Sequence, residues 1–252
     1  MKTKGNTILI TGGATGIGLA LAEVFLRKGN EVVICGRREQ KLSEANKKLP
    51  GLHVHRCDVA GAAGRKALFD WATASFPELN VLINNAGIQK EIDFRKGPAA
   101  YPGGDSEIET NLEAPIHLCA LFIPHLMKRK DAAIVNVSSG LAYVPMASTP
   151  VYCATKAGLH SFCLSLRHQL RETSIKVFEL LPPWTDTELG GAHEGGEERG
   201  YRGAPPAEVA EGCFAALAKD EFEIAVGQAQ SLRDGSRKAL EKTFQMLNNR
   251  DE

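Results

Sequence analysis

The strongest constraint on the fold is a regular alternation of two kinds of segment along the chain. Short apolar, β-branched runs such as 7–11 (TILIT) and 31–36 (EVVICG) are each followed by a longer run with helical periodicity. The alternation continues to 222–226 (FEIAV). Strands that alternate with helices pair in parallel, so the pattern predicts an α/β fold: a doubly wound parallel sheet of about seven strands with helices on both faces.

The length and the charge balance limit the domain count and the partners. A chain of 252 residues exceeds the usual domain size, but α/β sheets of this length commonly form one domain. We therefore expect a single domain over 1–252. Thirty basic and thirty acidic residues cancel, so the chain has no overall field to hold a polyanion or a membrane surface. Neither nucleic acid nor a membrane is an expected partner.

The expected compartment follows from the apolar runs and the cysteines. The first apolar run is only as long as a strand, which is too short for a signal peptide, and no later run approaches a membrane span. A cytoplasmic location is expected. The six cysteines are scattered without a C-x-x-C pair, which favours reduced, buried thiols over metal ligands. They are Cys35, Cys57, Cys119, Cys153, Cys163 and Cys213.

Three segments depart from the alternation. Residues 95–106 are rich in Pro and Gly and predict a surface loop. Residues 188–204 are glycine-rich and charged, and they predict either a mobile substrate loop or a surface insertion without a role. A C-terminal helix is expected at about 231–248. Its apolar positions would pack on the body of the protein or on a second subunit; they are Leu232, Leu240, Phe244 and Leu247.

A glycine-rich turn, TGGATGIG (11–18), joins the first strand to the first helix. Glycines in such a turn allow a tight bend, a close approach of the backbone to phosphate and close packing of helix on strand. An ordinary tight turn is the alternative, but the position within a βαβ unit favours a Rossmann-type dinucleotide site. The residues expected to contact the cofactor there are Gly12, Thr15, Gly16, Ile17 and Gly18.

The end of the second strand indicates which cofactor is preferred. An acidic residue there would accept hydrogen bonds from the ribose 2'-hydroxyl of NAD, whereas a 2'-phosphate requires cations. This chain has Arg37 and Arg38, and a guanidinium forms paired hydrogen bonds to phosphate. We expect NADP(H) to be preferred over NAD(H). The alternative is that both arginines begin a solvated helix, which suits Arg38 better than Arg37.

A phenol and an amine are spaced one helical turn apart at Tyr152 and Lys156. Positions four apart share a helix face, so both side chains can enter one site. A neighbouring ammonium favours the phenolate, and we therefore expect Lys156 to lower the pKa of Tyr152. The fifth strand ends in Ser138 and Ser139, either of which could donate to the substrate oxygen; neighbouring residues point to opposite faces of a strand, and the spacing favours Ser139. His160 and His168 follow on the same helix and are expected to be exposed or at an interface.

The ordered motifs TGxxxGxG, NNAG, an Asn in the following helix, Ser and YxxxK resemble the short-chain dehydrogenase/reductase family over residues 7 to about 190. The resemblance implies a catalytic tetrad of Asn111, Ser139, Tyr152 and Lys156, with Lys156 also holding the nicotinamide ribose. It further implies that a set of residues lines the cofactor cleft, namely Asp58, Val59, Asn85, Ala86 and Gly87.

The chain departs from the family after the sixth strand, where Pro-Gly is usual and this sequence has Pro182-Pro183. Proline removes a backbone donor and stiffens the turn. Thr185 and Thr187 match family cofactor contacts by position. This turn, the helix 150–169 and the C-terminal segment are similar to the DltE-like oxidoreductase branch of the family.

The leading hypothesis is an NADP(H)-dependent enzyme that transfers a hydride between nicotinamide and a carbonyl or secondary alcohol, with Tyr152 as general acid and base. No metal is expected. A redox sensor or scaffold that binds the nucleotide without turnover is the alternative, and an epimerase is disfavoured because little chain remains for a substrate domain. The resemblance implies a homodimer or homotetramer. Residues expected near the small-molecule substrate are Pro145, Met146, Trp184 and Tyr201.

Overall fold

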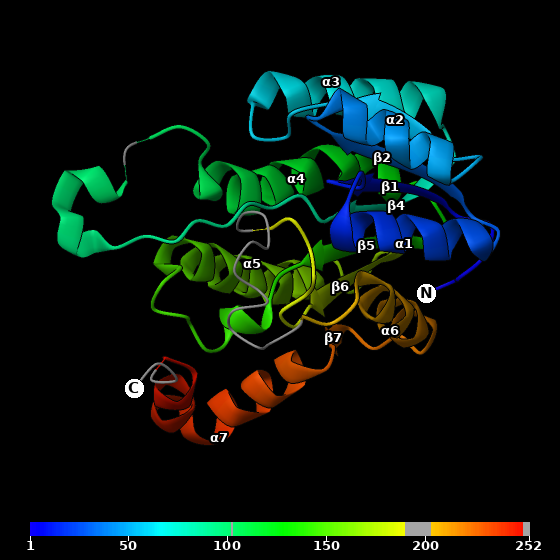
Figure 1. Cartoon of the computed structure of the whole chain (residues 1–252). Coiled ribbons are helices and arrows are strands. Elements are labelled where there is room, and N and C mark those ends of the chain that lie inside the picture. Colours follow the sequence, from blue (N-terminus) through cyan, green and yellow to red (C-terminus); the bar gives the residue numbers. More distant parts are fainter. Residues whose placement is uncertain (102, 190–202, 249–252) are drawn as a thin grey trace.

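The computed structural model describes residues 1–101, 103–189 and 203–248. These ranges contain one sheet of seven strands in the order β3-β2-β1-β4-β5-β6-β7, with every neighbouring pair parallel (Figure 1). The strand order reverses between β1 and β4, as in a doubly wound sheet. The expected fold is thus confirmed. The strands are β1 (Thr7–Thr11), β2 (Glu31–Gly36), β3 (His53–Arg56), β4 (Leu79–Asn84), β5 (Ala132–Val137), β6 (Ile175–Leu181) and β7 (Glu223–Ala225).

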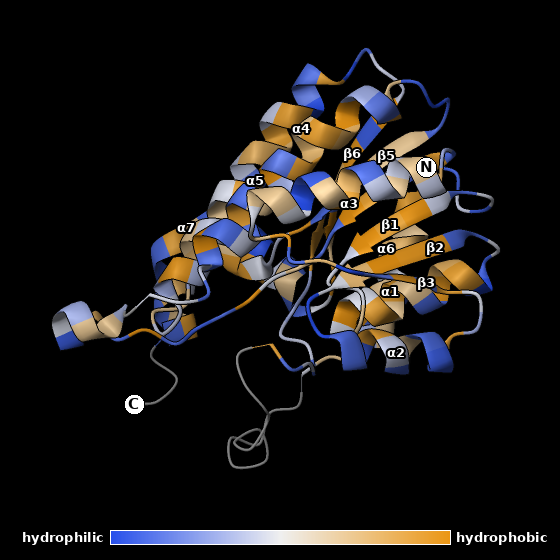
Figure 2. Cartoon of the chain, turned by 90° about the horizontal axis from the view of Figure 1, so that it is seen from above, coloured by the Kyte–Doolittle hydropathy of each residue, from blue (hydrophilic) through white to orange (hydrophobic). Residues whose placement is uncertain are grey.

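Helices cover both faces of the sheet and form two apolar cores. One face is covered by α1 (Gly16–Arg27), α2 (Glu39–Lys48) and α6 (Pro206–Ala218), and the other by α3 (Ala62–Ser75), α4 (Ala114–Leu126) and α5 (Pro150–Gln169). Figure 2 shows the strands between them as hydrophobic. Burial on both faces explains why the strands read as continuous apolar runs. All six cysteines are buried and unpaired.

The C-terminal helix, α7 (Gln228–Asn248), begins slightly before the expected position and breaks at Ala239. It lies beyond β7, in orange and red in Figure 1. Its first half packs on the body of the protein: a Cβ on Gly140 would lie 3.0 Å from the Cα of Ala229 and 3.1 Å from Leu232 Cδ1. Its second half exposes Leu240. The serine-bearing end of β5 therefore lies against this helix.

The remaining segments are short turns and loops. A 3-10 turn, η1 (Phe94–Ala100), occupies much of the expected 95–106 loop. A π-helical turn, η2 (Glu109–Glu113), leads into α4, and a 3-10 turn, η3 (Gly140–Ala142), follows β5. Most of the expected 188–204 loop, including Tyr201, lies outside the described residues. No helix within the described ranges is long and apolar enough to cross a membrane.

Candidate active site

The glycine turn packs closely against the segment after β4. Gly12 and Gly16 have positive φ angles of 64° and 56°, a conformation that favours glycine. A Cβ on Gly12 would lie 2.8 Å from the Cα of Ala86, and one on Gly18 would lie 2.5 Å from Asn85 Nδ2. These positions leave no room for a side chain. The turn and the Asn85–Ala86 segment therefore form one wall.

Hydrogen bonds fix this wall. The hydroxyl of Thr11 accepts from the backbone N–H groups of Asn85 and Ala86, each at 3.0 Å. The side chain of Asn85 donates in return to the carbonyls of Thr11 and Gly12, at 2.9 and 3.1 Å. Gly87 continues the segment toward the helix α5. The three cleft residues expected after β4 thus lie beside the turn.

The helix α1 begins at the turn and offers an anion site. Thr15 is its N-cap, and the first turn contains no acidic side chain. Backbone N–H groups at a helix start attract phosphate. Ile17 faces the apolar core, and a Cβ on Gly16 would lie 3.0 Å from the methyl carbon of Thr187. This glycine cradle fits the pyrophosphate of a dinucleotide, and a hollow of about 490 Å³ opens beside it without reaching Tyr152.

Two arginines lie at the outer end of this cleft, and each contacts a carboxylate. Arg37 Nη1 is 2.8 Å from Asp105 Oδ2. Arg38 Nη1 is 2.6 Å from Glu188 Oε2, and its Nη2 donates to the Thr15 hydroxyl at 3.1 Å. Arg38 therefore lies closer to the glycine turn than its assignment to a purely solvated helix start implies.

Asp58 and Val59, which the resemblance assigns to the adenine site, follow β3. Asp58 is exposed and accepts from the N–H of Ala60 at 3.0 Å, while Val59 is buried. Val59 and Ala86 line a narrow gap beside the ends of β1 and β4. The gap itself has no room for a ring, and Thr11, Asn84 and Thr110 also line it.

Tyr152 and Lys156 lie on one face of α5, directed at the end of β5. Pro150 begins the helix, and its fixed φ angle suits that first position. Both side chains are buried. Lys156 Nζ donates to the carbonyl of Val137 at 2.8 Å and lies 5.5 Å from the centre of the Tyr152 ring. The last residue of β5 therefore fixes the ammonium.

The pKa of Tyr152 differs from the expectation. Burial raises the pKa of the Tyr152 phenol, and a hydrogen bond with Ser139 only partly opposes this. The expected lowering by Lys156 is wrong here, because the ammonium bonds to the Val137 carbonyl and lies over the ring. Burial also lowers the pKa of Lys156 to about 8. Desolvation is thus the largest cause of both pKa shifts.

Asn111 approaches the same point from the π-helical turn η2. Its side chain accepts from Ile88 N at 2.9 Å and donates to Ile88 O at 2.8 Å. A Cβ on Gly87 would lie 3.5 Å from Asn111 Oδ1 and 3.7 Å from Lys156 Nζ. Gly87 therefore separates the amide from the ammonium. The structure brings together all four residues of the expected tetrad, with Ser139 at the start of η3.

Comparisons with known proteins agree with this geometry. Residues 6–197 match the family model described as short chain dehydrogenase. The chain is 50% identical to the uncharacterized oxidoreductase DltE of Bacillus subtilis (strain 168) over 251 residues, which covers 100% of both chains. The protein belongs to the short-chain dehydrogenase family. It is an oxidoreductase of the DltE-like branch, and its family binds NAD(P) and acts on small molecules.

More distant relatives share the fold. A short-chain dehydrogenase/reductase from Burkholderia phymatum, solved in complex with NAD, covers 99% of its own chain and 100% of this one at 22% identity and a TM-score of 0.84. A Burkholderia cenocepacia relative, in complex with NADP, has a TM-score of 0.82 at 24% identity, with 99% and 98% covered. The NADP-dependent 3-hydroxy acid dehydrogenase YdfG of Escherichia coli (strain K12) is 28% identical over 69% of this chain and 71% of its own.

This short-chain dehydrogenase differs from the usual family pattern after β6. Thr185 donates to the carbonyl of Pro183 at 2.8 Å and forms a bridge with Ala204. Thr187 accepts from Leu189 N at 3.3 Å and lies against Gly16. Of the expected substrate-pocket residues, Trp184 is 48% exposed. Asn248 of α7 donates to the carbonyl of Pro145 at 3.1 Å, so the C-terminal helix reaches that segment.

Sequence reasoning missed two buried glutamates of this short-chain dehydrogenase and the contact that one of them makes with His160. Glu107 is fully buried, accepts from Lys90 N at 3.1 Å and leaves its Oε2 without a hydrogen-bond partner. Glu179 is fully buried within β6. His160 is half-buried and binds Glu179, so it is not exposed; an interface position for it stays a prediction. The available signals were a Glu one turn before Asn111 and a Glu within the apolar run IKVFELL.

Proposed function

We propose that this oxidoreductase transfers a hydride between NADP(H) and a carbonyl or secondary alcohol carbon. The observation that carries the proposal is the convergence of Ser139, Tyr152 and Lys156 beside the glycine wall, with Asn111 bound to Ile88 behind them. A phenol, a hydroxyl and an amine gathered at the carboxyl edge of a dinucleotide fold form a proton-transfer site. A sensor or scaffold has no evident use for it.

Each residue has a role in the proposed reduction. Bound nicotinamide supplies the hydride. Ser139 donates a hydrogen bond to the substrate oxygen, and Tyr152 gives that oxygen its proton as the carbon is reduced. Lys156, held by the Val137 carbonyl, would bind the nicotinamide ribose, and Asn111 would support the reprotonation of Tyr152 through a water relay. In alcohol oxidation each transfer is reversed.

The raised pKa of Tyr152 favours reduction as the direction to test first. A phenol that keeps its proton at neutral pH is the acid form, which is the form that a carbonyl substrate requires. Lys156, with a pKa of about 8, loses its ammonium as the pH rises. Reduction should therefore fall at alkaline pH.

The proposal also includes a single domain over 1–252 and a cytoplasmic location.

Preference for NADP(H) rests on Arg37 and Arg38, which follow the end of β2 in place of the acidic residue that would bind the ribose of NAD. Both lie near the mouth of the cleft, and a 2'-phosphate would replace Asp105 or Glu188 as their partner. The relative YdfG is named as NADP-dependent, which supports this choice. Solved relatives hold either NAD or NADP. Thr185 and Thr187 would contact the nicotinamide half of the cofactor.

A homodimer or homotetramer is also proposed. Most apolar residues of α4 pack in its own core, including Leu118 and Phe122, so they do not carry this proposal. The exposed apolar side chains near the ends of α4 and α5, Met127 and Leu164, are candidates for burial between subunits. Analytical ultracentrifugation would measure the oligomeric state.

The first experiment compares equilibrium binding of NADPH and NADH to the purified protein. We expect NADPH to bind at least about tenfold more tightly, because a bidentate charged contact is worth about 1.5–3 kcal/mol. The variant Arg37→Asp should lose this preference. Arg171→Asp, at an exposed arginine just beyond the end of α5, is the matched control and should retain it. Equal binding would contradict the NADP(H) preference, and no binding would contradict the enzyme proposal.

A further inference from the structure

A buried carboxylate in the strand β6 has no role in the proposed mechanism. Glu179 has no exposed surface and lies in register with Asn136 on β5 and Glu223 on β7. A charge in the middle of an apolar strand is strongly disfavoured unless its oxygens are hydrogen-bonded or paired. Its partners therefore indicate its purpose.

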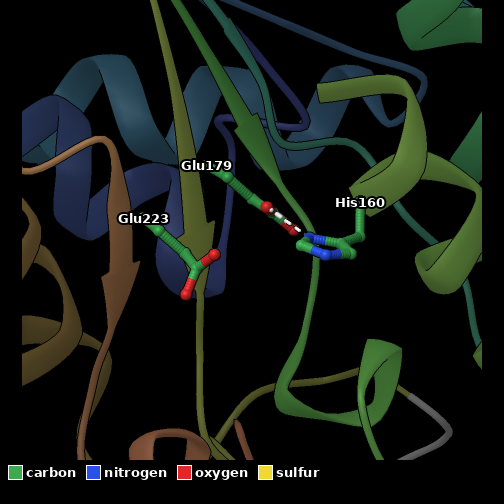
Figure 3. A group of neighbouring side chains, drawn as sticks. All are labelled: His160, Glu179 and Glu223. Atoms are coloured by element: carbon green, nitrogen blue, oxygen red, sulfur yellow. Dashed lines mark hydrogen bonds and ion pairs between the residues drawn. The ribbon is translucent and has the colours of Figure 1, made fainter. Parts of the chain in front are cut away.

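Both oxygens of Glu179 are engaged. Oε1 accepts from the hydroxyl of Ser138, and Oε2 lies 2.8 Å from His160 Nδ1. Figure 3 shows the imidazole meeting the carboxylate, with Glu223 on the neighbouring strand. Glu179 thus joins the end of β5 to the helix α5.

The two partners are neighbours of the proposed catalytic residues. Ser138 directly precedes Ser139, and its backbone N–H donates to Leu180 O at 2.8 Å. His160 follows Lys156 by one helical turn, as Lys156 follows Tyr152, so the three share one face of α5. The Glu179 carboxylate therefore lies behind both the serine turn and the Tyr152–Lys156 pair.

A metal ion is a poor explanation for this cluster. His160, Glu179 and Glu223 offer ligand atoms within 4.8 Å of one another. However, Arg237 Nη2 lies 3.0 Å and Arg233 Nη1 3.4 Å from Glu223 Oε1. Two guanidinium groups on one ligand repel a cation, and both oxygens of Glu179 already have partners. The cluster is better explained as a support between elements.

Contacts from α7 extend this support. The Tyr143 ring lies 4.7 Å from the His160 ring, and Arg237 Cζ lies 5.8 Å from the centre of the Tyr143 ring. Tyr143 directly follows η3, the turn that begins after Ser139. The C-terminal helix thus holds the serine turn from outside, while Glu179 holds it from within the sheet.

We propose that Glu179 is a positioning residue for the reaction: through Ser138 and His160 it fixes the serine turn against α5, and its negative charge lies behind the Tyr152–Lys156 pair. The inference rests on the proposed function, because the groups that it positions are those that transfer the proton. Residues of β6 and α5 behind the proposed catalytic groups would then position those groups.

Burial lowers the pKa of Lys156, and Glu179 acts in the opposite direction. Removing the carboxylate charge should therefore lower the pKa of Lys156 further. Other titratable groups also face Glu179 or its partners. Of these, only His160 is substituted in the tests below. They are His160, Cys163 and Arg167 on α5, Tyr143 after η3, Glu223 on β7, and Arg233 and Arg237 on α7.

The main test compares Glu179→Gln with the wild type in pH–rate profiles of carbonyl reduction. The amide keeps the size of the side chain but removes the charge. We expect the alkaline limb of the kcat profile to shift to lower pH by roughly half to one pH unit, which is the size of a buried charge interaction across one site. His160→Gln keeps a hydrogen-bond donor to Glu179 and should not shift the alkaline limb to lower pH. Glu172→Gln, at an exposed glutamate just beyond the end of α5, is the control and should match the wild type.

A second variant tests the mechanical part. Ser138→Ala removes one hydrogen bond to Glu179 and keeps the charges of Glu179 and Lys156. It should lower kcat severalfold with KM and the alkaline limb unchanged, because only the placement of Ser139 changes. This variant is informative even where Glu179→Gln folds poorly. If Glu179→Gln loses activity without a shift of the alkaline limb, the electrostatic part of the inference is overturned. If Ser138→Ala is fully active, the mechanical part is overturned.

A readout without turnover separates this inference from the proposed function. The Lys156 side chain can be titrated by NMR in protein carrying 13C-labelled lysine, with its resonance assigned from Lys156→Met. A lower pKa of Lys156 in Glu179→Gln supports the inference even where no carbonyl substrate is reduced, a result that would contradict the proposed function alone. An unchanged pKa of Lys156 in an active enzyme would overturn the inference alone.

Discussion

The two ends of the cleft handle charge in opposite ways. At the ribose end, Arg37 and Arg38 have side chains 43% and 55% exposed, and both contact carboxylates across loops. At the catalytic end, Tyr152 and Lys156 are 5% and 3% exposed, and Glu179 behind them is fully buried. Water screens the first set and is excluded from the second. The same kind of contact is therefore weak at one end and strong at the other.

The difference matches what each end has to do. Exposed ion pairs can exchange one partner for another at little cost, which suits a group that must release Asp105 or Glu188 and bind a phosphate. Buried groups keep one arrangement, which suits a proton transfer that depends on short distances. Substitutions at the two ends should accordingly differ in size, and the following predictions begin with the largest effect.

Tyr152→Phe should remove most turnover while leaving NADPH binding near that of the wild type. A positioned general acid contributes about 10²–10⁴-fold to the rate, so kcat should fall by that factor. Steady-state reduction of a carbonyl substrate and a binding titration measure the two quantities. Tyr101→Phe, an exposed tyrosine of the 95–106 segment, is the matched control. Turnover close to wild type would show that another group donates the proton.

Glu179→Ala should destabilise the protein by about 3–5 kcal/mol, because His160 and Ser138 lose a buried partner. Asp105→Ala breaks an exposed ion pair and should cost only about 0–1 kcal/mol. Urea unfolding followed by circular dichroism gives both free energies of unfolding. Similar costs for the two variants would contradict the contrast between the two ends.

The same buried pair predicts a pH dependence of stability. Glu179 raises the pKa of His160 above its usual value, so the protonated imidazole is stabilised in the folded state. Its contribution is complete below the unfolded pKa of about 6.5 and is lost as the pH rises through the folded pKa. His160→Gln should therefore lose more unfolding free energy at pH 6 than at pH 9. Unfolding curves at both values test this, and an equal loss would indicate that only the hydrogen bond matters.

The contrast also explains which features could be predicted from the sequence. The strand runs, the glycine turn and the Tyr152–Lys156 spacing depend on neighbours close in the chain, so local patterns indicate them. The Glu179–His160 pair joins a strand to a helix, and Arg37 binds an aspartate far along the chain. Such contacts depend on the packing of whole elements. The pKa of Tyr152 could not be predicted for the same reason, since its burial requires the assembled sheet.

Added salt should weaken NADPH binding severalfold between about 50 and 500 mM, because the Debye length shrinks to a few ångströms over that range. NADH lacks the 2'-phosphate and should respond less. The kcat of the bound enzyme should change little, since the charges around Lys156 are buried. Titrations of both cofactors at several salt concentrations test this. Equal salt dependence of the two cofactors would argue against a phosphate contact by the arginines.

The smallest expected effect is at Asp105. This carboxylate binds Arg37 at 2.8 Å in the structure and competes with a 2'-phosphate for the same guanidinium. Asp105→Asn should tighten NADPH binding by only about twofold to fivefold, because an exposed ion pair is worth little. NADH binding should not change. Asp93→Asn, which breaks a local pair with Arg95 in the neighbouring turn, is the control. Weaker NADPH binding in Asp105→Asn would mean that Asp105 orients Arg37 for the phosphate, and the ribose end would then be preorganised like the catalytic end.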